Sequence, residues 1–176
     1  MAGLPRERLE RLRDRLRAEG NRPSMLLGTA KASLDLMEAV QVVEEYGPLC
    51  EAMYLVMAAD RKIVASERQM LRGALEILSE GRVRTHHMDA MLDDSARRAA
   101  KEGFDVRLLK CLDVLAQDPA RAETAAVLAA AIAAADAVVV PEEHAVLRTM
   151  FERLHLEPER AAELLAELEA TTPHLP

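Results

Sequence analysis

The chain has 176 residues, half of them hydrophobic, and a formal net charge of −7. This length is enough for one well-formed hydrophobic core, and the low content of glycine and proline favours a helix-rich globular protein over a disordered one. The acidic balance and an aromatic content of only 2% argue against a general nucleic-acid binder, because basic surface and base-stacking side chains are both scarce. We therefore expect no nucleic-acid partner.

The two cysteines and the N-terminus bear on where the protein works. Cys50 and Cys111 are far apart and match neither a CxxC pair nor a disulfide framework, which favours a reducing compartment and two buried, unreactive thiols. The arginine-rich N-terminus has no apolar segment before a cleavage site, so no secretory signal is predicted. The longest uninterrupted apolar run, residues 125–135, is too short to span a bilayer. We expect a cytoplasmic protein without an integral membrane segment.

Residues 1–23 are predicted to form an Arg-rich helical arm. Through residue 22 the arm has seven arginines and four acidic residues, a net charge of +3, and the remainder therefore carries −7 − 3 = −10. One interpretation is a solvated helix packed by its leucines; the other is an arm that docks a partner protein or forms a homodimer. The candidate partner-binding residues are Arg8, Leu9, Leu12, Arg15 and Leu16, whose leucines lie at helical spacing.

From residue 24 to residue 172 the apolar pattern is helical almost throughout, and no convincing alternating strand appears. A first helix has an apolar face made of Leu36, Met37, Val40 and Val43. Further helices are predicted over residues 48–60, 66–81, 85–103, 105–117, 119–136, 142–156 and 158–170. The fold class we expect is all-α: a single domain of about seven to eight helices over 24–172, and a C-terminal tail at 173–176.

Two of these helices have distinctive local signals. In the helix over 105–117, Asp105 is the predicted N-cap, and the predicted buried stripe consists of Leu108, Leu109, Leu112 and Leu115. Asp118 followed by Pro119 is a strong start signal for the alanine-rich helix after it.

An internal repeat relates residues 58–78 to residues 134–154 with a constant shift of 136 − 60 = 76. In so alanine- and leucine-rich a chain about two coincidences are expected over this window, so duplication explains the match better. The identical positions are Ala58, Ala59, Asp60, Val64, Glu67, Leu71, Arg72, Glu76 and Leu78, which recur as Ala134, Ala135, Asp136, Val140, Glu143, Leu147, Arg148, Glu152 and Leu154. We therefore predict an internal pseudo-twofold duplication of a helix–loop–helix unit.

Each repeated unit is predicted as an apolar helix that ends at an aspartate, a short loop, and a glutamate that opens the next helix. A carboxylate at a helix start is favoured by the free backbone N–H groups and the helix dipole. The aspartates, at the opposite end of a helix, gain nothing from the dipole and need another explanation. The spacing matches the last part of an EF-hand loop, but the earlier ligand positions, Val56 and Ala58 in the first copy, cannot coordinate calcium.

If the two copies pack about a pseudo-twofold axis, their four carboxylates converge and need a balancing charge. One hypothesis is a hard divalent cation such as calcium or magnesium, with Asp60, Glu67, Asp136 and Glu143 as candidate metal ligands. The other is structural: the repeated Arg72 and Arg148 neutralise the aspartates across the interface.

The paired "AAD…I…E" and "AAD…V…E" units, with the apolar stripe after each and the helices between them, resemble the TerB family over roughly residues 30–168. This is the all-helical tellurite-resistance-associated domain, which also occurs fused to J-domains and other modules. The resemblance implies that Asp60, Glu67, Asp136 and Glu143 form the family's acidic cluster, proposed to bind a cation. Family members typically have "ADG" where this chain has "ADR" and "ADA", and the Arg-rich arm lies outside the family pattern.

No catalytic motif stands out, because the chain lacks GxSxG, a glycine-rich loop before a helix, and HExxH. His86 and Asp89 share a helix face but are too few to hold a metal. We expect a non-enzymatic TerB-like module that acts through protein–protein contacts in a stress-response or regulatory assembly, with cation binding at the acidic cluster left open. The alternative is a metal-free adaptor or scaffold whose Arg-rich helix docks a partner.

Overall fold

The protein is described here by a computed structural model, which places residues 10–11, 13–14, 31–59, 63–134 and 141–171. These residues form seven long helices and no strand, so the all-α prediction is confirmed. In chain order the helices are α2 (Lys31–Met57), α3 (Ala65–Leu78), α4 (Thr85–Glu102), α5 (Phe104–Leu115), α6 (Pro119–Ala133), α7 (Pro141–Arg153) and α8 (Pro158–Thr171).

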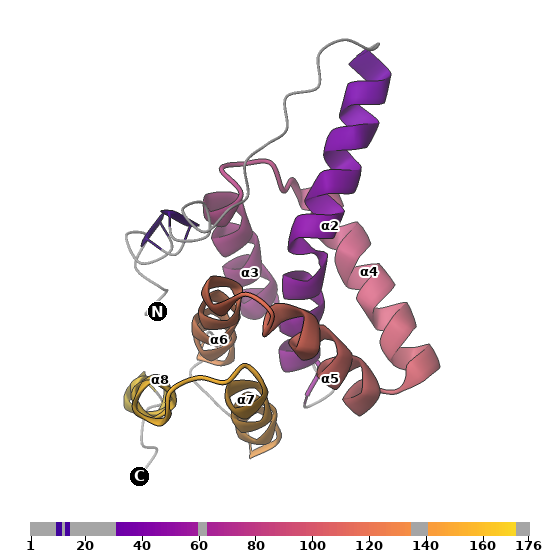
Figure 1. Cartoon of the computed structure of the whole chain (residues 1–176). Coiled ribbons are helices and arrows are strands. Elements are labelled where there is room, and N and C mark those ends of the chain that lie inside the picture. The colour runs from indigo at the N-terminus through magenta and orange to yellow at the C-terminus, as the bar shows by residue number, and fades with distance from the viewer. Residues whose placement is uncertain (1–9, 12, 15–30, 60–62, 135–140, 172–176) are drawn as a thin grey trace.

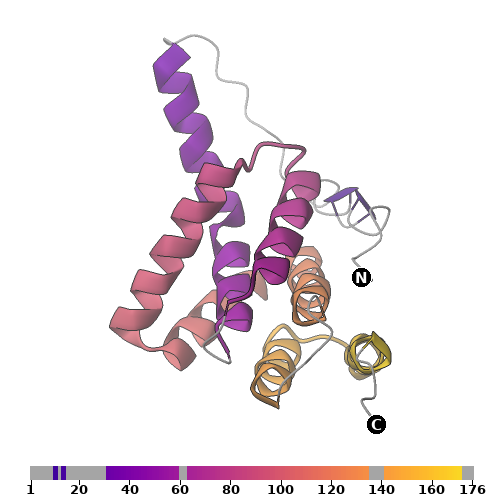
Figure 2. The same cartoon turned by 180° about the vertical axis from the view of Figure 1, so that it is seen from behind.

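Two helices, α2 and α6, form the centre of a single hydrophobic core (Figures 1 and 2). The second half of α2 packs among α4, α5 and α6, while α6 also contacts α3, α7 and α8. The sequence of α6 explains its place, because a helix that is apolar on all sides is stable only when other helices surround it. Its many alanines are buried, and their small side chains let the neighbouring helices approach closely.

Pro48 lies inside α2, where the sequence predicts a break between two helices. A proline in a helix interior removes one backbone hydrogen bond and costs about 3 kcal/mol. Tertiary packing offsets this cost, because side chains are buried on both sides of the proline: Tyr46 before it, Leu49 and Cys50 after it. The predicted pair of helices is therefore one helix of 27 residues.

The predicted start of α6 is confirmed in detail. Asp118 is the N-cap, and its Oδ1 accepts hydrogen bonds from the backbone N–H groups of Ala120 at 2.9 Å and Arg121 at 3.2 Å. Pro119 occupies the first helical position, where a missing N–H costs nothing. Local signals thus set where the central helix begins.

The start and the buried face of α5 differ from the prediction. Gly103, with φ of 95°, separates α4 from α5, so α5 begins at Phe104 and Asp105 lies in its first turn instead of capping it. Leu108, Leu112 and Leu115 are buried as predicted, but Leu109 is exposed and Cys111 takes its place in the core. The face of α5 that packs against α2 and α6 therefore includes Cys111 and does not include Leu109.

None of the described helices is both long and strongly apolar. The 27 residues of α2 include four glutamates, whereas the apolar α6 has only 15 residues. Among the described residues, no helix is both long enough and apolar enough to cross a membrane.

Candidate functional site

The boundaries of the two helix–loop–helix units repeat with the same shift as the sequence. The first helix of each unit ends at Met57 in α2 and at Ala133 in α6, and 133 − 57 = 76. The second helix of each unit begins at Ala65 in α3 and at Pro141 in α7, and 141 − 65 = 76. This agreement supports the duplication, which stays a prediction.

The buried faces of α3 and α7 also correspond position by position. In α3 the buried residues are Glu67, Leu71, Ala74, Leu75 and Leu78. Their counterparts in and just after α7 are all buried as well: Glu143, Leu147, Met150, Phe151 and Leu154. The two units cross, because α3 packs against α6 of the other unit and α7 packs against α2. Such an exchange is what a pseudo-twofold arrangement of two units would produce.

The two glutamates of the predicted acidic cluster each occupy the third position of a helix. Glu67 is only 2% exposed and Glu143 only 4%. The carboxylate of Glu67 accepts a hydrogen bond from the backbone N–H of Val64 at 2.9 Å, so it caps the start of α3. This contact gives Glu67 a local structural role, as the helix-start argument predicts.

The two aspartates of the cluster, Asp60 and Asp136, lie outside the described residues. Both follow their helix by three positions instead of ending it, because α2 stops at Met57 and α6 stops at Ala133. At the end of α2 the backbone tightens, with the N–H of Ala59 donating to the carbonyl of Val56 at 3.2 Å. Within the described part of the chain, no group of three or more potential metal-binding side chains comes together.

The arginines predicted to balance the aspartates are both exposed. Arg72 lies on α3 and Arg148 on α7, on the outer faces of these helices. Neither forms an ion pair with any residue that the structure describes. The hypothesis that these two arginines neutralise the acidic cluster therefore gains no support from the described contacts.

The five candidate partner-binding residues of the arm, Arg8, Leu9, Leu12, Arg15 and Leu16, also lie outside the described residues. The four arm residues that are described, Glu10, Arg11, Arg13 and Asp14, are helical, as predicted. Arg13 approaches Glu80, just after α3, at 3.6 Å. The arm and the acidic body therefore meet through at least one pair of opposite charges.

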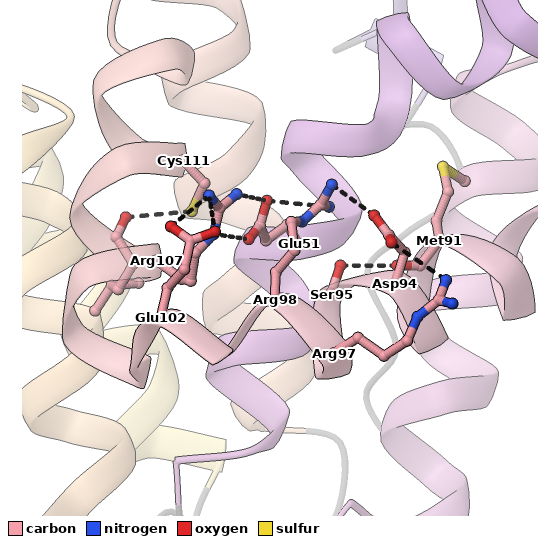
Figure 3. Close-up of polar contacts among 10 residues, drawn as sticks. Glu51, Met91, Asp94, Ser95, Arg97, Arg98, Glu102, Arg107 and Cys111 are labelled. Atoms are coloured by element: carbon pink, nitrogen blue, oxygen red, sulfur yellow. Dashed lines mark hydrogen bonds and ion pairs between the residues drawn. The ribbon is translucent and has the colours of Figure 1, made fainter. Parts of the chain in front are cut away.

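A buried ionic network that the sequence analysis missed joins α2, α4 and α5 (Figure 3). At its centre is Glu51 of α2, which is only 4% exposed. Arg107 of α5 donates to one carboxylate oxygen from Nε at 2.7 Å and to the other from Nη2 at 2.8 Å. Arg98 of α4 adds a contact at 3.2 Å. Because the hydrogen bonds from Arg107 favour its charged form, the pKa of Arg107 is raised above its ordinary value.

The rim of this network carries further ion pairs. Arg98 binds Asp94 at 2.6 Å, and Glu102 accepts hydrogen bonds from both Arg107 and Lys110. Arg98 Nε is buried without a hydrogen-bond partner among the described residues. Every charged residue of the network drawn in Figure 3, Arg98 included, has a counter-charge within the chain. We therefore assign it a structural role: it fixes α4 and α5 against α2.

Both cysteines are buried thiols, as predicted. Cys111 lies beside the network, and its Sγ donates to the carbonyl of Leu108 at 3.2 Å. Burial raises the pKa of Cys111 to about 12, and the nearby negative charge of Glu51 acts in the same direction. Burial alone raises the pKa of Cys50 to about 12. Neither thiol is therefore set up as a nucleophile or a metal ligand at neutral pH.

Comparison of the chain with protein-family models, with curated proteins and with solved structures finds no match.

Proposed function

We propose that the protein is a non-enzymatic, TerB-like helical module that acts through protein–protein contacts in a stress-response or regulatory assembly. The observation that carries the proposal is the pair of crossed helix–loop–helix units with equal boundary spacing and a buried glutamate at the same position of each. This arrangement is compatible with the sequence resemblance to the TerB family, which implies an acidic cluster formed by the two units.

The described polar chemistry favours a binding module over an enzyme. The largest buried polar group, around Glu51, consists of charges paired with each other, and both thiols have pKa values raised to about 12. Catalytic side chains instead need an open position for a substrate and a pKa suited to proton transfer. A module that works by contact needs neither.

The proposal includes a divalent cation, such as calcium or magnesium, at Asp60, Glu67, Asp136 and Glu143. One observation supports a cation: Glu67 and Glu143 are buried carboxylates in equivalent positions, each the third residue of its helix. If the pseudo-twofold packing brings them together with Asp60 and Asp136, the four carboxylates require positive charge nearby, and a divalent cation supplies it.

Thermal melts of the full chain test the cation. The protein is melted in EDTA and then with calcium, magnesium, manganese or zinc, alongside the Asp60→Asn/Asp136→Asn variant. At a concentration of 100 times its Kd an ion adds about 2.7 kcal/mol, and each kcal/mol raises Tm by about 2–4 °C for a chain of this size. We expect one ion to raise the Tm of the natural chain by roughly 5–10 °C, and the variant to lose this rise.

A matched control is Asp93→Asn/Asp105→Asn, which removes two exposed carboxylates elsewhere. It should keep the ion-dependent rise. If no ion moves the Tm of the natural chain, the cation is removed from the proposal and the metal-free adaptor becomes the better description. In that case deletion of residues 1–22 should abolish capture of the partner protein while leaving the melt nearly unchanged.

A further inference from the structure

The first half of α2 carries an exposed apolar stripe. Met37, Val40 and Val43 are 42%, 49% and 47% exposed, and they follow one another at three-residue intervals on one side of the helix. This part of α2 extends beyond the ends of the other helices in both views of the molecule (Figures 1 and 2). The sequence groups these residues as one apolar face, and the rest of the described chain leaves that face uncovered.

The stripe continues a face of α2 that is covered further along the helix. Continuing from Val43 at intervals of three or four residues leads to Gly47, then to Cys50 and Glu51. Cys50 and Glu51 are buried, Glu51 beneath Arg98 of α4 and Arg107 of α5. The same side of α2 is therefore covered by α4 and α5 near Glu51 and is exposed to solvent at Met37, Val40 and Val43. A contiguous apolar face of this kind is typical of a surface that another segment occupies.

Charged residues beside the apolar stripe of α2 indicate which kind of segment could bind there. Glu38 and Glu44 are exposed on the same part of α2 and border the apolar side chains. The chain after residue 22 carries a net charge of −10. An occupant should therefore be a helix with apolar residues at helical spacing and basic residues beside them.

The Arg-rich arm has that composition, with leucines at helical spacing and a net charge of +3. We propose that the apolar stripe of α2 binds the Arg-rich N-terminal helix of a second copy of this chain, giving a homodimer with exchanged arms. Leu9, Leu12 and Leu16 would meet Met37, Val40 and Val43, and the arginines of the arm would face Glu38 and Glu44. This inference rests on the proposed protein-contact function and names its partner segment.

The contact between Arg13 and Glu80 is compatible with such an exchange. It is a single ion pair of 3.6 Å between side chains that are 23% and 40% exposed. Exposed pairs of this kind contribute about 0–1 kcal/mol, so the contact does not hold the arm against a larger apolar surface. It places one arginine of the arm near an acidic residue of the body.

The oligomeric state of the full chain tests the proposal. Sedimentation velocity over a range of protein concentrations compares the natural chain, the chain without residues 1–22, and Val40→Arg. We expect the natural chain to be a concentration-dependent dimer, and the other two to dimerise at least about tenfold more weakly. Val114→Arg is the matched control, because Val114 of α5 is a valine of similar exposure, 45%, on another helix. It should dimerise like the natural chain.

Salt dependence provides a second, independent measurement. Contacts between arginines and glutamates weaken with ionic strength, so dimerisation should weaken as salt is raised. Charge reversal by Glu38→Lys/Glu44→Lys should weaken it at low salt. Circular dichroism and the melting temperature of each variant show whether it is still folded.

Several outcomes would overturn the proposal. A natural chain that is monomeric at every concentration removes the homodimer, and a dimer that survives Val40→Arg removes the α2 stripe. A dimer that survives deletion of residues 1–22 but not Val40→Arg means that the stripes of two α2 helices pair directly. None of these results changes the effect of ions on the melting temperature. Failure of the homodimer proposal can therefore be told apart from failure of the proposed cation site.

Discussion

Arg107 of α5 binds both carboxylate oxygens of Glu51 of α2, although the two residues are 56 positions apart in the sequence. The pair bridges two helices of the core, and the Glu51 side chain is 5% exposed while that of Arg107 is 15% exposed. A charge pair removed from water in this way depends on both of its members, because loss of either one leaves the other in a buried position with only its weaker partner, Arg98 for Glu51 and Glu102 for Arg107.

Replacing one member of this pair should be far more damaging than replacing both. Arg107→Met leaves the Glu51 carboxylate buried with only Arg98 in contact, and we expect the free energy of unfolding to fall by about 3–5 kcal/mol. The double variant Glu51→Leu/Arg107→Met should recover most of that loss, because packed apolar side chains replace ion pairs well. Urea unfolding of the natural chain, of Glu51→Leu, of Arg107→Met and of the double variant gives the coupling energy. Additive losses would show that the pair does not act as a unit.

The cap of α6 should have a measurable effect on stability. Asp118→Ala removes the acceptor of two backbone N–H groups and should cost about 1 kcal/mol in urea unfolding. Asp118→Asn keeps a side-chain oxygen at the same place and should cost much less. Asp93→Ala, a change at an exposed position inside α4, serves as the control and should stay within about 0.5 kcal/mol of the natural chain. An equal cost for all three changes would contradict the assigned cap.

Acid should destabilise the protein through two ion-paired carboxylates at the surface. Hydrogen bonds from Lys110 and then Arg107 lower the pKa of Glu102 below its ordinary value of 4.5, and Arg153 lowers the pKa of Asp113 below 3.8. A carboxyl with a lowered pKa in the folded state contributes stability that is complete above its ordinary pKa and is lost as the pH falls through the lowered value. Both contributions are therefore present at neutral pH and disappear in the acid range.

The measurement is the free energy of unfolding between pH 7 and pH 2. We expect Glu102→Gln/Asp113→Asn to be less stable than the natural chain at pH 7 and to lose less stability on acidification. Raised salt should shrink the difference between the two proteins, because these pairs are exposed to solvent. Parallel pH curves for the two proteins would contradict the assignment.

The two thiols should be protected until the protein unfolds. Burial raises the pKa values of Cys50 and Cys111 to about 12, so almost no thiolate is present at pH 8 and a reagent cannot reach either sulfur. Ellman's reagent should therefore react with the native protein slowly, at a rate that follows unfolding, and with both thiols at once in denaturant. Fast reaction of one thiol in the native state would show that its region opens on its own.

The sequence predicts those features of the fold that depend on neighbouring residues, and it fails where distant packing decides. The start of α6 follows from Asp118 and Pro119 alone, so it could be predicted. Pro48 is locally a helix breaker, yet burial on both sides of it keeps α2 continuous. Leu109 has the spacing of a core residue, but the orientation of α5 against α2 and α6 turns it outward.

The same distinction applies to the polar sites. Glu51 is a charged residue within the apolar sequence "PLCEAMYLVM", and a single charge in an apolar segment is a signal by which it could have been predicted to need a buried partner. Its partners could not be found from the sequence, because Arg98 and Arg107 reach it only through the packing of α4 and α5 against α2. The glutamates in the first turns of α3 and α7 could be predicted, since a helix start favours a carboxylate, and for Glu67 the backbone N–H of Val64 supplies the hydrogen bond.

The proline inside α2 also divides that helix into two parts of different local stability. Pro48 has no N–H to donate to the carbonyl of Glu44, so the chain of helical hydrogen bonds is interrupted where the covered part of α2 meets the part with the exposed stripe. Fewer buried contacts hold the first half, and it can open while the second half stays in the core. Amide hydrogen exchange should therefore change abruptly near Pro48, within one unbroken helix.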